Sequence, residues 1–207
     1  MSRLSAWIVA LACVWATTFS GRGDLILNTD FEVNQGFGGG TADSWINTGR
    51  SGIEGWSAHS GSWGLAVYGF ALPETPYYGT FYQVATGVQA GNDYGFSIWA
   101  NKDDNFTAAA AELSVEWYDI DSLRIGGVTN NVYSSLNTSW QQFTVSGTAP
   151  ANATTLRVQV NVTGINDGGA LKFDEANLTV VPEPGAFTLS VVGMVFGLAV
   201  HRLRRRA

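Results

Sequence analysis

Carboxylates are the side chains of this 207-residue chain that come closest to a catalytic pattern. A glycoside hydrolase needs two of them about 5–9.5 Å apart. Glu112 and Glu116 would share one face of a strand, but four residues at about 3.3 Å each separate them by roughly 13 Å. Asp119 and Asp121 would lie about 6.6 Å apart in an extended chain, yet their position predicts a hairpin turn with solvated carboxylates. The sequence therefore predicts a protein that is not an enzyme; only a carboxylate pair assembled from distant strands is left open.

Other catalytic groups are scarce. Cys13 is the only cysteine and lies in an N-terminal apolar run. His59 is the only histidine before the C-terminal tail, and it sits in a Ser/Gly turn. A capping or packing role is the expectation for it, and a place in a Ser-His-Asp triad is the alternative. The glycine run at residues 38–40 lacks the Lys-Ser/Thr sequel of a phosphate-binding loop.

The N-terminus has the pattern of an export signal. Arg3 precedes an apolar run over residues 4–14, and small and polar residues follow as far as Gly21. This order is typical of a secretory signal peptide, so we assign residues 1–23 to one that the Sec machinery exports. An uncleaved anchor is the alternative. Cleavage would remove Cys13 and leave a body without a thiol or a disulfide.

The C-terminus carries a polar motif, an apolar segment over residues 185–200 and a basic tail. The apolar segment would form a transmembrane helix, and arginines stay on the cytoplasmic side of a bilayer. The motif is Val181, Pro182, Glu183 and Pro184, and the tail contains Arg202, Arg204, Arg205 and Arg206. This order resembles the PEP-CTERM sorting signal of Gram-negative bacteria that make extracellular polysaccharide.

The resemblance implies that an exosortase, a membrane-embedded cysteine transpeptidase, cuts near the motif. The body would then reach the cell envelope, the outer surface or the extracellular matrix, with membrane contact only through residues 181–207 before processing. A plain single-span anchor is the alternative, and a buried core helix is the third possibility.

Without these two segments the body is strongly acidic. Residues 24–181 hold sixteen acidic and five basic side chains, a net charge of about −11. Such a body repels nucleic acid and anionic lipid, so neither is an expected partner. It could attract divalent cations. Its length suits one domain over residues 24–180.

Alternation of apolar and polar residues dominates that body and predicts strands. The predicted strands cover residues 65–68, 80–84, 94–99, 112–117, 140–145, 155–162 and 171–180. Turn formers separate them, among them Gly126 and Gly127, and only residues 107–111 could begin a helix. Residues 31–78 alternate little, which predicts long loops or irregular strands. The pattern indicates an all-β fold, an antiparallel β-sandwich or jelly roll.

Five segments of the body resemble carbohydrate-binding modules of the family 4/9 type, which have a galactose-binding-like jelly roll. They match the family's opening, its H-S-G turn, its A-G-x-x-Y-x-x-S-x-W strand, and its two closing strands, at residues 27–32, 59–65, 83–100, 140–144 and 173–178. Thr29 replaces the family's glycine, and Glu175 replaces its second Asp.

The resemblance implies a structural calcium that ties the first strand to the last. Carried over, its ligands are the carboxylates of Glu32 and Asp174 and main-chain oxygens near Ser62 and Asp174, with Asp30 as a further one. Calcium takes six to eight oxygen ligands, which suits an exported protein without disulfides. The alternative is that Glu32 and Asp174 only hydrogen-bond a loop.

Sugar contact needs flat aromatic faces beside polar groups. The aromatic residues outside the alternating strands or at their edges are the candidates, namely Trp45, Trp56, Tyr77 and Tyr78. Trp99, Trp117 and Trp140 lie in alternating strands and are expected in the core. A core or edge-covering role is also open for the loop tryptophans.

Two function classes remain. The first is a non-catalytic module that binds extracellular glycan or exopolysaccharide. The second is a structural matrix protein of the same fold without a discrete ligand, and a polysaccharide-active enzyme is a distant third. The fold alone does not choose between them, because one fold hosts many functions.

Overall fold

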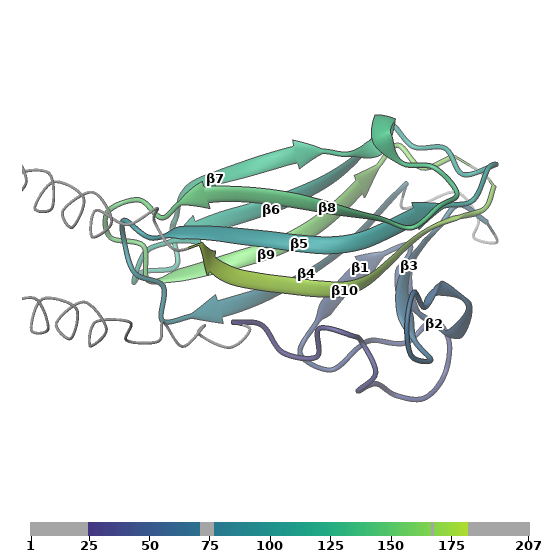
Figure 1. Cartoon of the computed structure of the whole chain (residues 1–207), viewed down its shortest axis with the longest axis horizontal. Helices are drawn as coiled ribbons and strands as arrows, with labels where there is room; N and C mark the ends of the chain where they lie inside the picture. The colour runs from purple at the N-terminus through teal and green to yellow at the C-terminus, as the bar shows by residue number, and fades with distance from the viewer. Residues whose placement is uncertain (1–24, 71–76, 167, 182–207) are drawn as a thin grey trace, which may run out of the picture.

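The computed structural model describes residues 25–70, 77–166 and 168–181, which form a sandwich of two antiparallel sheets (Figure 1). One sheet has the strand order β1-β4-β9-β6-β7, and the other has the order β2-β3-β10-β5-β8. The strands in these ranges are β1 (Ile46–Gly49), β2 (Ser51–Glu54), β3 (Gly64–Tyr68), β4 (Tyr78–Thr86), β5 (Asp93–Lys102), β6 (Ala110–Tyr118), β7 (Arg124–Asn131), β8 (Gln141–Thr148), β9 (Thr155–Thr163) and β10 (Ala170–Val181).

Two single-turn 3₁₀ helices, η1 (Gly55–Ser57) and η2 (Tyr133–Ser135), complete the described elements. Among the described residues there is no helix long and apolar enough to cross a membrane. The predicted signal peptide, the predicted transmembrane segment and the basic tail lie outside the described residues, as does the sorting motif except for Val181. Val181 itself is the last residue of β10.

Alternation along each strand separates a core face from an open face. In β9, Leu156, Val158 and Val160 are fully buried, whereas Arg157 and Gln159 between them are half-buried. Successive side chains of a strand point to opposite faces of its sheet. The same pattern in β4 and β6 gives the first sheet one apolar face and one polar face.

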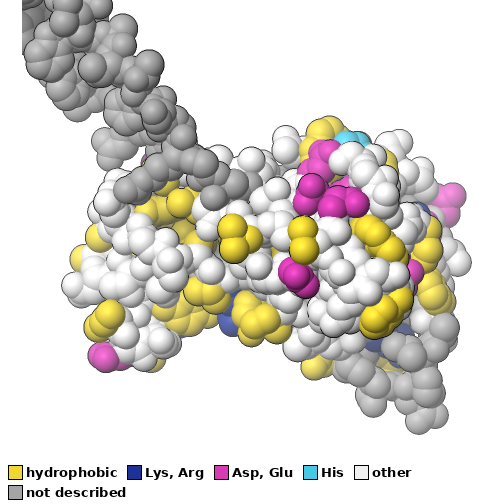
Figure 2. Space-filling model, turned by 90° about the horizontal axis from the view of Figure 1, so that it is seen from below, with side chains coloured by type: hydrophobic (Ala, Val, Ile, Leu, Met, Phe, Trp, Pro, Cys, Tyr) yellow, Lys and Arg dark blue, Asp and Glu magenta, His cyan; other side chains and the backbone are white. Residues whose placement is uncertain are grey.

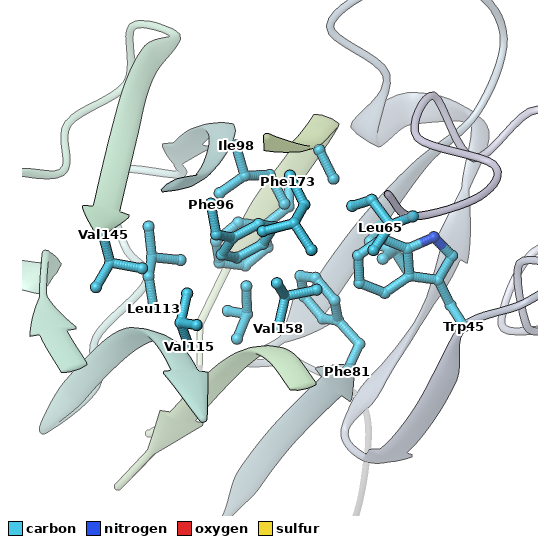
Figure 3. Close-up of a cluster of buried hydrophobic side chains, with 14 of the residues drawn as sticks. Trp45, Leu65, Phe81, Phe96, Ile98, Leu113, Val115, Val145, Val158 and Phe173 are labelled. Carbon is cyan, nitrogen blue, oxygen red and sulfur yellow. The ribbon is translucent and has the colours of Figure 1, made fainter. Parts of the chain in front are cut away.

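The core lies between the apolar faces of the two sheets (Figure 3). Phe81 of β4 meets Phe173 of β10 edge to face, with ring centroids 5.1 Å apart, and so joins the sheets. Leu113, Val115 and Val158 come from the first sheet, and Leu65, Phe96, Ile98 and Val145 come from the second. This apolar burial is the main term that stabilises the fold.

Strand β10 is the longest and runs along the centre of its sheet. Its first residues pair with β3, Ala170 opposite Tyr68, and its last residue Val181 pairs with Asp93 of β5. The register with β5 shifts between Asp174 and Asn177, and Glu175 there has a φ of 50°. A bulge of this kind re-aims the side chains beside it.

The predicted all-β sandwich is confirmed, and each predicted strand is present. Strand β7 was not predicted, because it lies at the sheet edge, is mostly exposed and therefore does not alternate. Gly126 and Gly127, interpreted as a turn, are inside it. Residues 107–111 start no helix, since β6 begins at Ala110. The irregular region predicted at residues 31–78 contains the short strands β1 and β2 and all of β3.

Candidate functional site

The open face of the first sheet carries a continuous set of polar and aromatic side chains. Cross-strand register places Asn161 between Thr80 and Glu112, and in the next row it places Gln159 between Tyr82 and Ser114. We call this surface the polar face; it consists of Thr80, Tyr82, Glu112, Ser114, Glu116, Tyr118, Arg157, Gln159 and Asn161. The hydroxyl of Thr80 donates to the Oδ1 atom of Asn161 across 2.8 Å.

Arg157 organises one end of the polar face. Its guanidinium lies 5.1 Å from the Tyr82 ring centroid and 5.5 Å from that of Tyr118, and its Nε donates to Glu116 at 2.9 Å. Arg124 donates to the other Glu116 oxygen at 3.1 Å. Burial acts to raise the pKa of Glu116, but hydrogen bonds from Arg157 and Tyr118 and the charges of Arg157 and Arg124 lower it below its usual value. The carboxylate is thus held ionised and oriented.

Two of the predicted sugar contacts border this surface. Tyr78 begins β4, points outward in the same alternation as Thr80 and Tyr82, and is 42% exposed. Tyr77 precedes it, is more exposed still, and lies 5.4 Å from the Arg50 guanidinium. An exposed ring at the rim of a polar face can stack on a sugar ring, so both residues stay candidates.

The predicted contact Trp45 is a core residue, and its assignment to the glycan site is wrong. It is 4% exposed, its ring packs against Phe31 and Phe81 at centroid distances of 5.2 and 5.9 Å, and its Nε1 donates to the Asn28 carbonyl at 3.0 Å. Neither face of the Trp45 ring is therefore accessible to a sugar. Polar neighbours in the sequence concealed this burial, which depends on β4 and on the loop before β1.

Trp56 is exposed but lies away from the polar face. It belongs to η1, is 47% exposed, and contacts Tyr68 and Phe70 with centroid distances of 6.4 and 6.0 Å. Tyr68 and Phe70 line a pocket of about 360 Å³ together with Glu54 and the glycine run. The sequence did not single out Tyr68, Phe70 or Glu54.

The predicted calcium ligands both hold the loop at residues 59–63. Glu32 Oε1 accepts the backbone N–H groups of Ser62 at 2.7 Å and Trp63 at 2.8 Å. Asp174 Oδ2 accepts those of His59 at 2.7 Å and Ser60 at 3.0 Å. Asp30 Oδ1 is 3.5 Å from the Glu32 N–H. This arrangement is the loop anchoring that the sequence left as the alternative to calcium.

The same arrangement is compatible with a calcium ion. A carboxylate oxygen has two acceptor positions, so accepting an N–H does not exhaust it. Asp174 is fully buried, and that burial raises the pKa of its carboxyl despite hydrogen bonds from Ser60, Glu175 and His59. In the described ranges, no three His, Cys, Asp or Glu side chains are placed so that they could hold a metal ion together, so main-chain oxygens and water would supply the other ligands. Calcium stays a prediction.

His59 packs against tryptophans of the second sheet. Its ring stacks on Trp99 at 4.5 Å and 17°, lies 5.0 Å from Trp140, and its Nδ1 is 3.2 Å from Glu175 Oε2. Figure 2 shows acidic side chains gathered beside this histidine. The expectation of a packing role therefore agrees with the structure. Trp99 and Trp140 are only half-buried on the outer face, so their predicted place in the core is wrong, whereas Trp117 is a core residue.

Two of the four carboxylates considered for hydrolysis, Glu116 and Asp119, have other partners. Glu116 is paired with two arginines, and Asp119 Oδ1 accepts the N–H groups of Asp121 and Leu123 at 3.0 and 2.9 Å. Asp119 therefore caps the turn between β6 and β7, as the hairpin position predicted.

Comparisons with known proteins support the fold. No family model and no curated protein matches this chain. Among solved structures, a family 16 carbohydrate-binding module is similar, with 16% identity, 75% of this chain and 99% of that one covered, and a TM-score of 0.55. A CBM4 structure has 18% identity, the same coverages and a TM-score of 0.50.

A third similar structure is the enzymatically active domain of tailspike protein 4 from bacteriophage CBA120. Its identity is 11% and its TM-score 0.59, and the match covers 76% of this chain but only 21% of the tailspike chain. At such low identities these similarities show the jelly-roll sandwich alone, because unrelated functions share this fold.

Proposed function

We propose that this chain is an exported, non-catalytic protein that binds extracellular glycan on the polar face. The observation that carries the proposal is the presence of tyrosine rings on one open sheet with amide, hydroxyl, carboxylate and guanidinium groups. A sugar ring offers C–H groups to an aromatic face and hydroxyls to polar side chains, which can both donate and accept. The polar face has tyrosine rings for the C–H groups of a sugar and polar side chains for its hydroxyls.

The dimensions and charge of this surface favour an extended neutral chain. Five strands about 4.8 Å apart make the sheet roughly 19 Å wide, more than one sugar residue needs. Glu112 and Glu116 on the polar face are balanced in number by Arg157 and the adjoining Arg124, so this surface offers hydrogen bonds without a large net charge. The body's net charge of about −11 opposes nucleic acid.

Two observations support a non-catalytic role. The Glu116 carboxylate is fixed by two arginines that hold it ionised, whereas a general acid in glycoside hydrolysis needs a raised pKa. Asp119 is engaged as a turn cap. Similar solved structures include two carbohydrate-binding modules, which is consistent with the proposal.

The location follows from the two terminal segments. We propose that the Sec machinery exports the chain, and that an exosortase processes it after β10 at the motif that includes Pro182, Glu183 and Pro184. The body would then act at the envelope, outer surface or extracellular matrix of a Gram-negative bacterium that makes exopolysaccharide. The membrane would hold it only through the C-terminal segment, before processing.

We also propose that one calcium ion binds at the loop anchored by Glu32 and Asp174. The two carboxylates converge on neighbouring residues of one loop, and Asp174 is buried with backbone N–H groups of His59, Ser60 and Glu175 as its hydrogen-bond donors. An ion there would stabilise the loop and would take no part in chemistry.

Binding assays on the purified protein test the proposal. Contact over about 100–150 Å² at about 25 cal/mol per Å² supplies roughly 3 kcal/mol before association costs, so micromolar to millimolar affinity is expected. Titration calorimetry against a panel of neutral and acidic polysaccharides should identify a ligand. Tyr78→Ala and Gln159→Ala should each weaken its binding at least about tenfold.

The matched control is Ile120→Ala, a change of an 81% exposed apolar residue in the β6–β7 turn. It should bind like wild type. If wild type binds no polysaccharide but assembles with itself, the structural matrix alternative replaces ours. If wild type cleaves a polysaccharide and an acid-to-amide variant does not, the protein is an enzyme and the proposal is wrong.

A further inference from the structure

Strands β1, β2 and β3 meet at one corner of the sandwich (Figure 1), and residues of these strands line a pocket there. We call it the aromatic pocket; it has a volume of about 360 Å³ and is lined by Gly38, Gly39, Gly49, Ser51, Glu54, Tyr68 and Phe70. Ligand sites in proteins have volumes of about 300–1,000 Å³ and combine apolar walls with a few placed polar groups. The aromatic pocket is at the small end of that range.

Glycines bring the loop backbone close enough to form one wall. Gly39 donates its N–H to the Ile53 carbonyl at 2.9 Å, and Gly40 accepts from the Ile53 N–H at 3.0 Å, so the loop pairs with β2. A Cβ on Gly38 would lie 2.5 Å from Glu54 Oε2, and a Cβ on Gly52 would lie 2.7 Å from the Tyr68 hydroxyl. A larger residue at Gly38 would displace the Glu54 carboxylate, and one at Gly52 would displace the Tyr68 hydroxyl.

The Glu54 carboxylate and the Tyr68 hydroxyl form one hydrogen-bonded pair. The Tyr68 hydroxyl donates to Glu54 Oε1 at 3.0 Å. Burial, and then the charge and hydrogen bond of Glu54, raise the pKa of Tyr68 far above its usual value, so the phenol keeps its proton on this bond. Both residues line the pocket, and Glu54 Oε2 and the phenol oxygen keep acceptor capacity, which suits a ligand with hydroxyl donors.

Two aromatic rings, those of Tyr68 and Phe70, line the pocket, and Trp56 packs against both of them. Tyr68 and Phe70 are 5.6 Å apart, and Trp56 lies within 6.4 Å of both. Trp56 and Phe70 nevertheless remain 47% and 42% exposed. An exposed aromatic surface beside oriented acceptors is the arrangement that stacks on the C–H face of a sugar while accepting from its hydroxyls.

The charges around the pocket set the kind of sugar. The Lys172 ammonium, 5.7 Å from the Trp56 ring, is paired with Asp103 at 2.7 Å and so is neutralised. The Arg50 guanidinium lies over Tyr77. Among the described residues, Glu54 is the charged residue that lines the pocket, and its carboxylate repels an anionic ligand.

We propose that the aromatic pocket binds a single neutral sugar residue and disfavours uronates, independently of the polar face. Two like charges about 6 Å apart repel enough to weaken binding about threefold at an effective dielectric constant of about 80, and about a hundredfold at about 20. The uronate of a bound sugar should therefore bind at least about threefold more weakly than the neutral sugar.

The test uses the purified protein and the methyl glycosides of glucose, galactose and mannose with their matching uronates, measured by ligand-observed NMR and calorimetry. Wild type should bind at least one neutral glycoside with millimolar affinity. Phe70→Ala should weaken it about five- to tenfold, the loss from roughly 40–55 Å² of ring contact. Glu54→Gln, nearly equal in shape, should bring the ratio of neutral to uronate affinity close to one.

Controls separate this site from the polar face. Asn161→Ala on the polar face and Ile120→Ala in the turn should leave glycoside binding unchanged, while Asn161→Ala should weaken polysaccharide binding. The inference is overturned if no neutral glycoside binds wild type, if uronates bind equally or more tightly, or if Phe70→Ala binds as wild type does. Loss of glycoside binding in Asn161→Ala would also overturn it, because the two surfaces would then be one site.

Discussion

Replacing Trp45 by Ala should destabilise the protein severely, and Trp56→Ala should not. The Trp45 indole is 4% exposed, packs edgewise on Phe81 and tilts against Phe31, and its Nε1 holds the Asn28 carbonyl at 3.0 Å. Removing it takes away the side chain that fills the space between the loop before β1 and strand β4.

The size of the effect follows from these contacts. A tryptophan truncated to alanine in a core costs about 3–5 kcal/mol, because the cavity adds to the lost transfer free energy. The Asn28 carbonyl loses its donor, which adds about 1 kcal/mol. The total of about 4–6 kcal/mol corresponds to roughly 8–24 °C, since 1 kcal/mol shifts the melting temperature by about 2–4 °C in a domain of this size.

Thermal and urea unfolding followed by circular dichroism measure the change. Trp56→Ala is the matched control, because it removes the same side chain from a position that is 47% exposed. It should cost no more than about 2 kcal/mol, since only part of the indole is transferred to water. If Trp45→Ala melts within about 2 °C of wild type, the account of Trp45 as a core residue is refuted.

Three further outcomes are expected. Millimolar calcium should raise the melting temperature by several degrees, since a hundredfold excess over Kd adds about 2.7 kcal/mol, and Asp174→Ala should abolish this shift; equal melting in calcium and chelator contradicts the calcium proposal. The pKa of Glu116 is lowered in the folded state, so its ionised carboxylate stabilises the fold. This stabilisation is complete above the usual carboxyl pKa and is lost as the pH falls through the lowered value. Glu116→Gln should therefore cost about 1.5–3 kcal/mol at pH 7 and little at acid pH, and equal costs at both would exclude this linkage. Intact-mass analysis of protein from the native host should find the chain truncated near Pro184, and a major species that retains residues 187–207 would contradict processing.

The alternation of apolar and polar residues predicted the strands well, because a sheet with one buried and one exposed face produces this pattern within each strand. β4, β6 and β9 could be read from the sequence because their outward residues are polar and their inward residues are apolar. β7 could not, because an exposed edge strand has no buried face to mark the period.

The sites were harder to predict because they depend on register. Thr80 and Asn161 are 81 residues apart and become neighbours only when β4 pairs with β9. The aromatic pocket likewise needs the loop of Gly38 beside Glu54. Burial of Trp45 depends on Phe81, a distant residue whose position no local pattern gives. The loop contacts of Glu32 and Asp174 were foreseen only through family resemblance.

The course of β10 also fixes how the folded body would be presented. The strand starts opposite Tyr68, which lines the aromatic pocket, and ends at Val181, from which the chain continues to the sorting motif. Eleven steps of about 3.3 Å separate these ends by roughly 35 Å. A chain tethered through the segment after Val181 would therefore hold the aromatic pocket at its distal end. There it could meet a terminal sugar of a neighbouring polymer before any other part of the molecule.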